Sequence, residues 1–328
     1  MPRKRRVVVV GGAVLDAKVR TRAAVVLGTS NPGTASSGVG GVGRNIAENL
    51  ARLGTPIELV AAVGDDLPGR AVLAHTEASG VGCSHVRTSV YPTGTYTAVL
   101  DDGGDLLIAV ADMRATDELG VVDLAVVPSL LDGADALVVD ANLSADAVRW
   151  LLSAAAEAGV LALLEPVSVA KAGDVATVLD DRVPLHTVTP NVDELAALVG
   201  RAVPDTAEGI ADAALVLHAC GVEHVWVRRG TGGSLLSMAA PAPSRPHLVL
   251  VEAPAVEVAD VTGAGDAMTA GYVHALLGGS SVVESARYGQ VLAALTCASP
   301  DTVRTDLTPD LVAAHLTPTQ PAIEELDR

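Results

Sequence analysis

The sequence predicts an α/β protein, built as a doubly wound, mainly parallel sheet with helices on both faces and a small β-sheet lid. Strand-like and helix-like segments alternate over most of the chain, which favours a parallel sheet covered on both sides. Two β-type runs around an Asp/Gly turn, within residues 95–110, stand apart from this alternation and predict a hairpin. The 328 residues are 49% hydrophobic, so the chain can bury a sizeable core.

The first part of the chain predicts two strand–helix pairs. A β-branched run forms the first strand, and a helical pattern ending at Gly54 follows a stretch rich in Gly, Ser and Thr. The second helix has Pro68 at its start and Gly80 after its end. In chain order the four segments are 6–11, 44–53, 57–63 and 68–79.

The hairpin comes next. Residues 96–100 and 106–110 are the two β-type runs, and the five residues between them are Asp and Gly only. We expect this hairpin and parts of 17–38 to form the lid, which then takes in roughly 17–38 and 90–112. Because no internal repeat or linker divides the chain, residues 1–328 are predicted to form one domain.

The remaining segments alternate regularly. Strands are predicted at 136–140, 160–164, 185–188 and 224–228, followed by a β stretch to about residue 258. Helices are predicted at 144–158, 191–199, 205–219, 263–277 and 281–299. Ligands of such sheets bind outside the carboxyl ends of the strands, so functional residues are sought in the loops at that edge.

The amino-acid composition argues against several classes of function. Asp and Glu outnumber Lys and Arg by 39 to 22, a net charge of −17, which argues against nucleic-acid binding. No apolar run reaches the about 18 residues of a membrane helix, so no membrane partner is expected. The three dispersed cysteines offer neither a disulfide framework nor a paired metal site, which fits a cytoplasmic protein. The eight histidines are scattered and are interpreted as surface or incidental residues.

The segment from Asp260 to Met268 carries the sharpest chemical signal. Gly263, Ala264 and Gly265 let the backbone turn tightly into a helix whose first N–H groups can bind an anion. Asp266 follows in the first turn, where a carboxylate also complements the helix dipole. An anion site with a carboxylate one turn away is what phosphoryl transfer requires.

A second glycine-rich segment precedes the first helix. Gly38, Gly40 and Gly43 match G-x-G-x-x-G, but they follow a loop rather than a strand, so a dinucleotide site is disfavoured. We interpret the segment as one that lets a sugar approach the backbone. Asn45 would bond the sugar hydroxyls, or act only as a helix-capping side chain.

Two further segments are each compatible with a functional and a purely structural interpretation. Asn191 and Glu194 have the i, i+3 spacing of an oxygen site for water-held Mg²⁺, and also that of an ordinary helix start. Residues 228–233 either approach a nucleotide or form a hairpin turn. The chain has no G-x-x-x-x-G-K-[ST] pattern, which excludes a P-loop kinase.

Taken together, these segments resemble the PfkB, or ribokinase-like, carbohydrate kinases. The residues 40–45 and 260–266 are similar to that family's two signatures, and Asn191-x-x-Glu194 is similar to its magnesium motif. The resemblance spans roughly residues 6–300. It implies a ribokinase-like fold whose lid closes over the sugar and often forms a dimer contact. It also implies ATP, Mg²⁺ and phosphorylation of a primary hydroxyl of a small-molecule sugar or nucleoside.

Within the family the chain looks most similar to pseudouridine kinases, which implies phosphorylation of the 5′-hydroxyl of that nucleoside. The segments that carry this likeness are 30–33, 40–51, 111–113, 140–144 and 165–168. The alternatives are another family activity, on ribose, fructose or a purine nucleoside, and a non-catalytic nucleoside-binding protein on the same fold. A Rossmann dehydrogenase is a more distant alternative.

The resemblance also implies roles for individual residues. Asp266 would be the catalytic base, and the amides of Gly263, Ala264 and Gly265 the anion hole. The substrate would be held by Asp16, Ser30, Asn31, Gly40, Gly41, Asn45, Asp112 and Asn142, with Ser30, Asn31 and Asp112 proposed to accept from the base. The nucleotide would contact Asn191, Arg229, Gly230, Gly232, Gly263 and Gly265. Asn191 and Glu194 would hold Mg²⁺, and Asp260 and Thr262 a monovalent cation such as K⁺.

Three residues, in two segments, depart from the family pattern. Glu165 stands where the family has Asp before Pro-Val-Ser, and Arg228 with Arg229 stands where small or hydroxyl residues precede Gly230.

Overall fold

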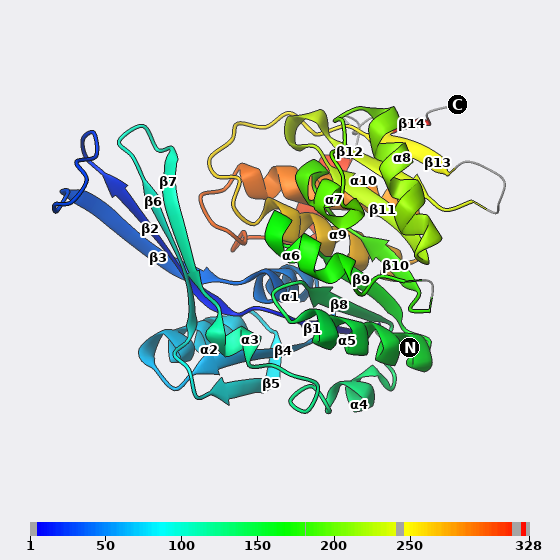
Figure 1. Ribbon diagram of the computed structural model, residues 1–328, viewed down its shortest axis with the longest axis horizontal. Coiled ribbons are helices and arrows are strands. Elements are labelled where there is room, and N and C mark those ends of the chain that lie inside the picture. The colour runs from blue at the N-terminus through cyan, green and yellow to red at the C-terminus, as the bar shows by residue number, and fades with distance from the viewer. Residues whose placement is uncertain (1–4, 181, 241–245, 317–322, 326–328) are drawn as a thin grey trace.

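A computed structural model describes residues 5–180, 182–240, 246–316 and 323–325. It contains two sheets, and Figure 1 shows the smaller one projecting from the main body. The main sheet has ten strands in the order β14-β13-β12-β11-β10-β9-β8-β1-β4-β5. These strands are β1 (Val7–Val10), β4 (Ile57–Gly64), β5 (Gly82–Ser89), β8 (Ala136–Asp140), β9 (Leu161–Glu165), β10 (Leu185–Val188), β11 (Val222–Arg228), β12 (Ser234–Met238), β13 (His247–Val251) and β14 (Ile323–Glu325).

Strand polarity divides the main sheet into two parts. From β5 to β11 neighbouring strands are parallel, and β12, β13 and β14 add antiparallel strands at one edge. Strand β1 is central and pairs with both β4 and β8. Its four valines are fully buried, as expected of a strand with helices on both faces.

Helices cover both faces of the sheet, and each face has a core. On one face the core includes side chains of α4 (Val127–Leu131), α5 (Ala145–Ala158), α6 (Val169–Ala176), α7 (Val192–Val199) and α8 (Ala207–Ala219). On the other face it includes α1 (Val42–Arg52), α2 (Leu67–Ala78), α9 (Ala264–Gly278) and α10 (Val282–Cys297). The short helix α3 (Arg114–Asp117) and α11 (Pro309–Leu316) complete the helices of the described residues.

The smaller sheet has four strands in the order β3-β2-β6-β7 and is called the projecting sheet below. Its strands are β2 (Val14–Thr21), β3 (Gly33–Gly40), β6 (Gly94–Leu100) and β7 (Leu106–Asp112). β2 pairs antiparallel with β3 and parallel with β6. Because β2 follows β1 and β3 leads into α1, this sheet starts and ends at the carboxyl edge of the main sheet.

The structure confirms the predicted fold class and corrects several elements. Strand β5, helix α6 and the antiparallel partner β14 were not predicted. The β stretch expected to reach residue 258 ends at Val251, since residues 252–258 form no strand. β2 and β3 begin at residue 14 and end at residue 40, beyond the predicted range 17–38.

Candidate active site

Asp266 lies in the first turn of α9 and is 8% exposed. Gly263 precedes the helix with a φ of 80°, a left-handed conformation that favours glycine. N–H groups in the first turn have no acceptor within the helix, so this turn can bind an anion. Of the three amides predicted for the anion hole, that of Ala264 already donates to the Val261 carbonyl at 3.3 Å. The turn nevertheless places a carboxylate directly beside helix-start amides, as the sequence predicted.

Burial raises the pKa of Asp266 to about 7. The Asn45 side chain works against this, because its Nδ2 donates to Asp266 Oδ2 at 2.7 Å. Repulsion from the Glu165 and Asp140 carboxylates raises the pKa further, and the Arg228 cation lowers it. A carboxylate with a pKa near 7 can exchange a proton at neutral pH, which is what a general base does.

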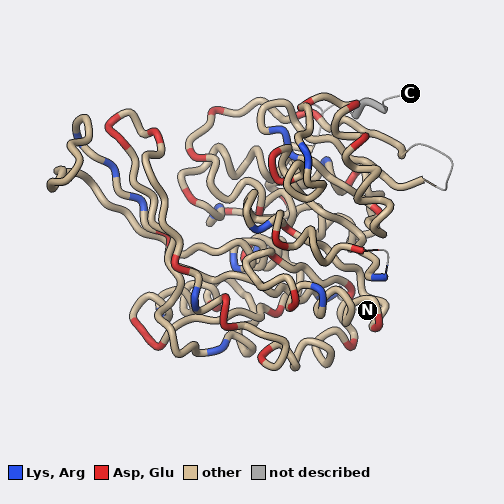
Figure 2. Tube along the Cα trace, in the orientation of Figure 1, with Lys and Arg blue, Asp and Glu red and all other residues tan. Residues whose placement is uncertain are grey.

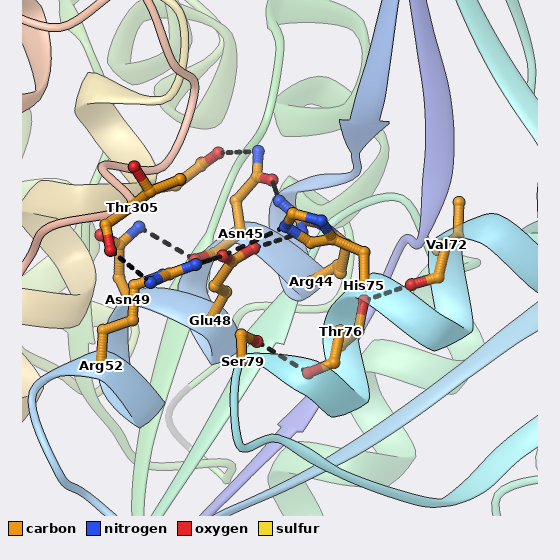
Figure 3. A network of polar contacts seen from close by, with 11 residues as sticks. Arg44, Asn45, Glu48, Asn49, Arg52, Val72, His75, Thr76, Ser79 and Thr305 are labelled. Carbon is orange, nitrogen blue, oxygen red and sulfur yellow. Dashed lines mark hydrogen bonds and ion pairs between the residues drawn. The ribbon is translucent and has the colours of Figure 1, made fainter.

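Both polar atoms of the Asn45 side-chain amide form hydrogen bonds. Its Oδ1 accepts from the Arg44 guanidinium, while its Nδ2 points to Asp266. Arg44 also pairs with Glu48, and both side chains are 1% exposed. Figure 3 shows these side chains along α1, with Arg52 and His75 also directed at Glu48. The network fixes Asn45 as a donor to Asp266.

Asp16 lines a cavity of about 350 Å³ between the projecting sheet and α1. Burial raises its pKa to about 6, and the Arg44 and Lys18 cations oppose that rise. A Cβ at Gly40 would overlap the Asp16 carboxylate, which explains the glycine there. The cavity is also lined by Lys18, Ser36, Ser37, Gly38, Val39, Arg44, Glu48, His75, Pro300, Asp301, Thr302, Val303 and Thr305.

The two other glycines at the start of α1 allow a close approach to the loop after β1. Gly41 has a φ of 97°, and a Cβ there would overlap the Gly12 carbonyl. Gly43 packs against Gly11 and donates its N–H to Asp140 Oδ2 at 2.8 Å. These two glycines therefore allow the start of α1 to pack closely against the loop after β1, and the approach of a sugar to this segment stays a prediction.

Asp140 is a buried carboxylate of the candidate site that the sequence analysis did not single out as a site residue. It is fully buried at the end of β8, and its Oδ2 accepts from the amides of Gly12 and Gly43, each at 2.8 Å. Its Oδ1 accepts from the Asn142 amide at 3.0 Å. Asp140 thus joins the loop after β1 to the start of α1. The feature of the sequence that could have identified Asp140 is its position at the carboxyl end of a buried strand.

A second and larger cavity, of about 720 Å³, opens beside Asp266. Its polar side includes Glu165, Glu194 and Arg228. Arg228 Nη2 lies 2.7 Å from Glu165 Oε1 and 3.0 Å from Glu194 Oε2. A Cβ at Gly265 would overlap the same guanidinium, so Arg228 lies against the helix-start glycine. The apolar lining includes Val167, Pro254, Val256, Val258, Val261 and Ala293.

Two of the residues that depart from the family pattern, Glu165 and Arg228, therefore contact each other. The Glu165 side chain is 2% exposed and also accepts from the hydroxyls of Thr189, at 2.6 Å, and Thr269, at 3.1 Å. Each of these groups donates a hydrogen bond to the Glu165 carboxylate, and the Arg228 guanidinium also offsets its negative charge.

Asn191 and Glu194 form a capping box at the start of α7. Asn191 Oδ1 accepts from the Glu194 amide at 2.8 Å, and Glu194 Oε2 accepts from the Asn191 amide at 2.9 Å. The i, i+3 spacing of Asn191 and Glu194 thus forms an ordinary helix start in this structure. Both residues nevertheless line the larger cavity, so a ligand there meets the Glu194 carboxylate.

The segment after β11 forms a short turn at the mouth of the larger cavity. Gly230–Gly232 is a single 3₁₀ turn, and Gly230 lines the cavity. Arg229 instead pairs with Asp205, with Nε 2.6 Å from Oδ1. Of the predicted nucleotide residues in this segment, Gly230 borders the cavity, whereas Arg229 and Gly232 are not among its lining residues.

Lys18 occupies the position predicted for a monovalent cation. Its Nζ, on β2, lies 2.6 Å from Asp260 Oδ2 and 2.9 Å from Thr262 Oγ1. Asp260 Oδ1 also accepts from the amide and hydroxyl of Thr262. The resemblance predicted K⁺ at these two residues, and the structure puts an ammonium group of the chain on them instead.

Of the eight predicted substrate residues, Asp16 lines the smaller cavity, and the other seven are not among the lining residues of either cavity. Ser30 and Asn31 are in the loop between β2 and β3, where Asn31 closes the loop by bonding the backbone of Val26 in both directions at 2.9 Å. Asp112, at the end of β7, forms a fork with Arg114 whose bonds lower the pKa of Asp112 to about 2. Asn142 is 6% exposed and lies beside Gly12.

Acidic residues are spread over the whole trace and basic residues lie among them (Figure 2). No helix in the described part of the chain is long and apolar enough to cross a membrane.

Comparisons with known proteins agree with this geometry. The family pattern of pfkB family carbohydrate kinases matches residues 4–308. A pseudouridine kinase of Escherichia coli (strain K12) is 32% identical over 315 residues, which cover 94% of this chain and 95% of that protein. A solved carbohydrate kinase from Agrobacterium tumefaciens has a TM-score of 0.81 at 31% identity, covering 98% of this chain and 100% of the other.

The fold is shared with a more distant solved structure. Arabidopsis thaliana ribokinase complexed with ribose and ATP has a TM-score of 0.80 at 24% identity, over 96% of this chain and 99% of the other. The site geometry, the family pattern and these relatives lead to one conclusion: the chain belongs to the pfkB family of carbohydrate kinases and is a kinase of sugars or nucleosides.

Proposed function

We propose that the protein transfers the γ-phosphoryl group of ATP to the 5′-hydroxyl of pseudouridine, giving pseudouridine 5′-phosphate and ADP. The observation that carries the proposal is the position of Asp266. It is a buried carboxylate with a pKa of about 7 at a helix start, it borders the larger cavity, and Asn45 links it to the wall of the smaller one. Two ligands bound in these cavities would meet at this carboxylate.

In the proposed reaction Asp266 accepts the proton of the 5′-hydroxyl as the oxygen attacks phosphorus. Asn45 orients the Asp266 carboxylate through the 2.7 Å hydrogen bond. The first-turn amides of α9 stabilise negative charge on the transferred group, as helix-start amides do for phosphates. Asp16, with Gly40 and Gly41 beside it, would hold the ribose hydroxyls in the smaller cavity.

The larger cavity is the proposed ATP site. Its apolar wall, with Val256 and Ala293, suits a purine ring, and its polar end holds Arg228 against Gly265. Mg²⁺, when bound, would neutralise phosphate charge. Glu165 and Glu194 offer the oxygen donors that Mg²⁺ prefers, and because Arg228 already bonds both, we propose that they and Asn191 hold the ion through water.

We propose that Lys18 replaces the monovalent cation that the family resemblance implies. The Asp260 carboxylate already has an ammonium group at 2.6 Å, so a second cation there would be repelled. The donor set of Asp260 and Thr262 therefore does not fit K⁺ in this arrangement.

Pseudouridine is the proposed substrate because the E. coli relative with 32% identity is a pseudouridine kinase. This nucleoside carries an N1–H that uridine lacks, and a buried acceptor left without that donor costs about 1–3 kcal/mol. Ser36, opposite Lys18 in the pairing of β2 and β3, lines the smaller cavity and is our proposed contact to the base. Closure of the projecting sheet would be needed to bring Ser30, Asn31 or Asp112 to the base.

We also propose a homodimer through the projecting sheet. Leu106, Ile108 and Val110 alternate along β7 and are 57%, 57% and 60% exposed. An apolar strip of this kind on one strand is typical of a protein contact. Association through these strips would cover both at once.

The test is ADP release with ATP, Mg²⁺ and a substrate panel of pseudouridine, uridine, adenosine, inosine, ribose and fructose. We expect the highest kcat/KM for pseudouridine, with uridine lower by at least about tenfold because of the missing N1–H. Preferred turnover of another substrate would reject pseudouridine and keep the kinase. Nucleoside binding without ADP release would instead favour a non-catalytic binding protein.

A further inference from the structure

Three histidines, His186, His218 and His224, lie close together at the amino-terminal end of strands β10 and β11. His186 is on β10, His224 is on β11, and His218 precedes β11 in helix α8. The sequence interpretation of the histidines as surface or incidental residues did not anticipate this grouping. Four residues of strand, about 13 Å, separate His224 from Arg228 at the opposite edge, so the group is remote from the proposed active site.

His186, His224 and the neighbouring Glu223 form a compact donor set. One donor atom from each residue lies within 4.8 Å of the other two. The two imidazole rings are 4.8 Å apart between centroids, with an interplanar angle of 77°. His218 is not part of the set, because its Nδ1 contacts the Val222 carbonyl at 2.7 Å and its Nε2 contacts Ser237 Oγ at 2.9 Å.

The two rings differ in their hydrogen bonds. His186 Nδ1 lies 2.8 Å from Thr187 Oγ1, which in turn lies 3.0 Å from the Tyr272 hydroxyl, so His186 retains Nε2 as a ligand atom. His224 Nδ1 is buried without a hydrogen-bond partner among the described residues. An unsatisfied buried nitrogen carries a desolvation penalty of about 1–3 kcal/mol, which a bound ligand would remove.

Burial favours the neutral form of both imidazoles. Burial lowers the pKa of His224 to about 4, and the neighbouring His186 and His218 lower it further. The pKa of His186 is also lowered, chiefly by burial. Neutral rings keep a lone pair on one nitrogen, and the hydrogen bond at His186 Nδ1 is the kind that fixes the orientation of a metal-ligating histidine.

We propose that His186, Glu223 and His224 form a site for a transition-metal divalent cation of the Zn²⁺ type, which joins β10 to β11 at the edge of the sheet opposite the active site. Two imidazole nitrogens and one carboxylate select Zn²⁺, Co²⁺ or Ni²⁺ over Mg²⁺ and Ca²⁺, which prefer oxygen ligands only. Zn–ligand bonds of about 2.0–2.2 Å place donors roughly 3.4 Å apart in a tetrahedron. The exposed Glu223 carboxylate can rotate to close that gap, and water completes the coordination.

Zn²⁺ is the probe, with tag-free protein first treated with a chelator. Equilibrium dialysis against Zn²⁺ measures stoichiometry and Kd, and Co²⁺ absorption reports the ligand geometry. We expect about one Zn²⁺ per chain and a rise in Tm on binding. Glu223→Gln and His224→Ala should each raise Kd by at least about tenfold. His315→Ala removes an exposed histidine on α11 and is the matched control with unchanged Kd.

Two outcomes would overturn the site. One is wild-type protein that retains no Zn²⁺ at about 100 μM free ion. The other is Glu223→Gln, a substitution at an exposed side chain that leaves the core intact, binding Zn²⁺ as tightly as the His315→Ala control. If His224→Ala fails to fold, Glu223→Gln alone decides between these results.

Discussion

At the residue scale, the central feature of the site is a buried carboxylate with polar and charged neighbours. Asp266 is surrounded by Asn45, Glu165, Arg228 and Asp140, and the charges of these neighbours partly cancel. What remains is the effect of burial, which raises the pKa to about 7. Asp266 is thus easily protonated and easily deprotonated near neutral pH, which distinguishes it from a carboxylate that serves only to start a helix.

Asp266→Asn should therefore abolish most turnover while leaving the fold in place. The amide keeps the size of the side chain but cannot accept a proton, and a positioned general base contributes about 10²–10⁴ in rate. ADP release measures turnover, and circular dichroism with Tm measures the fold. Asp193→Asn, at an exposed carboxylate in the first turn of α7, is the control and should retain full activity. Turnover of Asp266→Asn within about tenfold of wild type would remove Asp266 from the base role.

The pH profile offers a separate check on the same carboxylate. Because the proposed reaction requires deprotonated Asp266, we expect kcat/KM to fall tenfold per unit below pH about 7. Asn45→Ala removes a hydrogen bond that lowers this pKa, so the acidic limb should move to higher pH. The same variant should raise KM for the nucleoside more than KM for ATP. An unmoved limb with equal changes in both KM values would contradict the role of Asn45.

Glu165 and Arg228 should behave as one unit in stability measurements. Arg228→Gln leaves two buried carboxylates without their cation, which costs about 3–5 kcal/mol for a broken buried pair. The double variant Glu165→Gln/Arg228→Gln should cost less than the sum of the two single changes, as measured by urea unfolding. Additivity within about 0.5 kcal/mol would show that the two residues are independent. Arg182→Gln, at a side chain that is 83% exposed, is the control and should change stability little.

Candidate site residues that belong to a motif or to a glycine-rich turn can be identified from the sequence. Contacts between residues that lie far apart in the sequence cannot. Gly41 and Gly263 were predictable because their positions require a left-handed backbone. The contact between Asn45 and Asp266 joins residues 221 positions apart, so no spacing pattern reports it. The capping box of Asn191 and Glu194 shows the opposite case, in which one spacing is compatible with two structures.

At the element scale, segments with a clear hydrophobic period were predicted and atypical ones were not. Strand β5 reads Gly-Cys-Ser-His-Val-Arg-Thr-Ser, with few apolar residues, because it lies at the sheet edge and is covered on fewer sides. Helix α6 has only eight residues, and its start depends on the Ser168 cap rather than on a long amphipathic pattern. The hairpin of β6 and β7 was predictable because its turn consists of Asp and Gly alone.

The contact between strand β2 and the loop before α9 leads to a prediction about monovalent cations. Lys18 supplies one positive charge to Asp260, so the wild-type rate should differ by less than about twofold between KCl and choline chloride at equal ionic strength. Lys18→Met should lower the rate and make it respond to K⁺. A wild-type rate that falls about tenfold without K⁺ would show that Lys18 does not replace the ion.

At the scale of the whole molecule, the projecting sheet is the part of the fold least covered by the rest of the chain (Figure 1). The Asp260–Lys18 contact and the smaller cavity connect its base to the catalytic edge. The far strand β7 instead exposes apolar side chains. A monomer would leave this strip in water, whereas a partner subunit would cover it and keep the base of the sheet at the active site.

Ile108→Glu should therefore convert a dimer into a monomer. The isoleucine is 57% exposed in the middle of β7, and a carboxylate facing its own copy would add repulsion to the loss of apolar contact. Light scattering after gel filtration measures the mass of the particle. Leu215→Glu, at a side chain that is 42% exposed on α8, is the matched control and should leave the mass unchanged. Because the projecting sheet forms one wall of the smaller cavity, the proposed nucleoside site, the monomer should also show a raised KM for the nucleoside and an unchanged KM for ATP. A wild-type protein that is already monomeric at micromolar concentration, or an Ile108→Glu variant that stays dimeric, would assign the apolar strip on β7 to some other role.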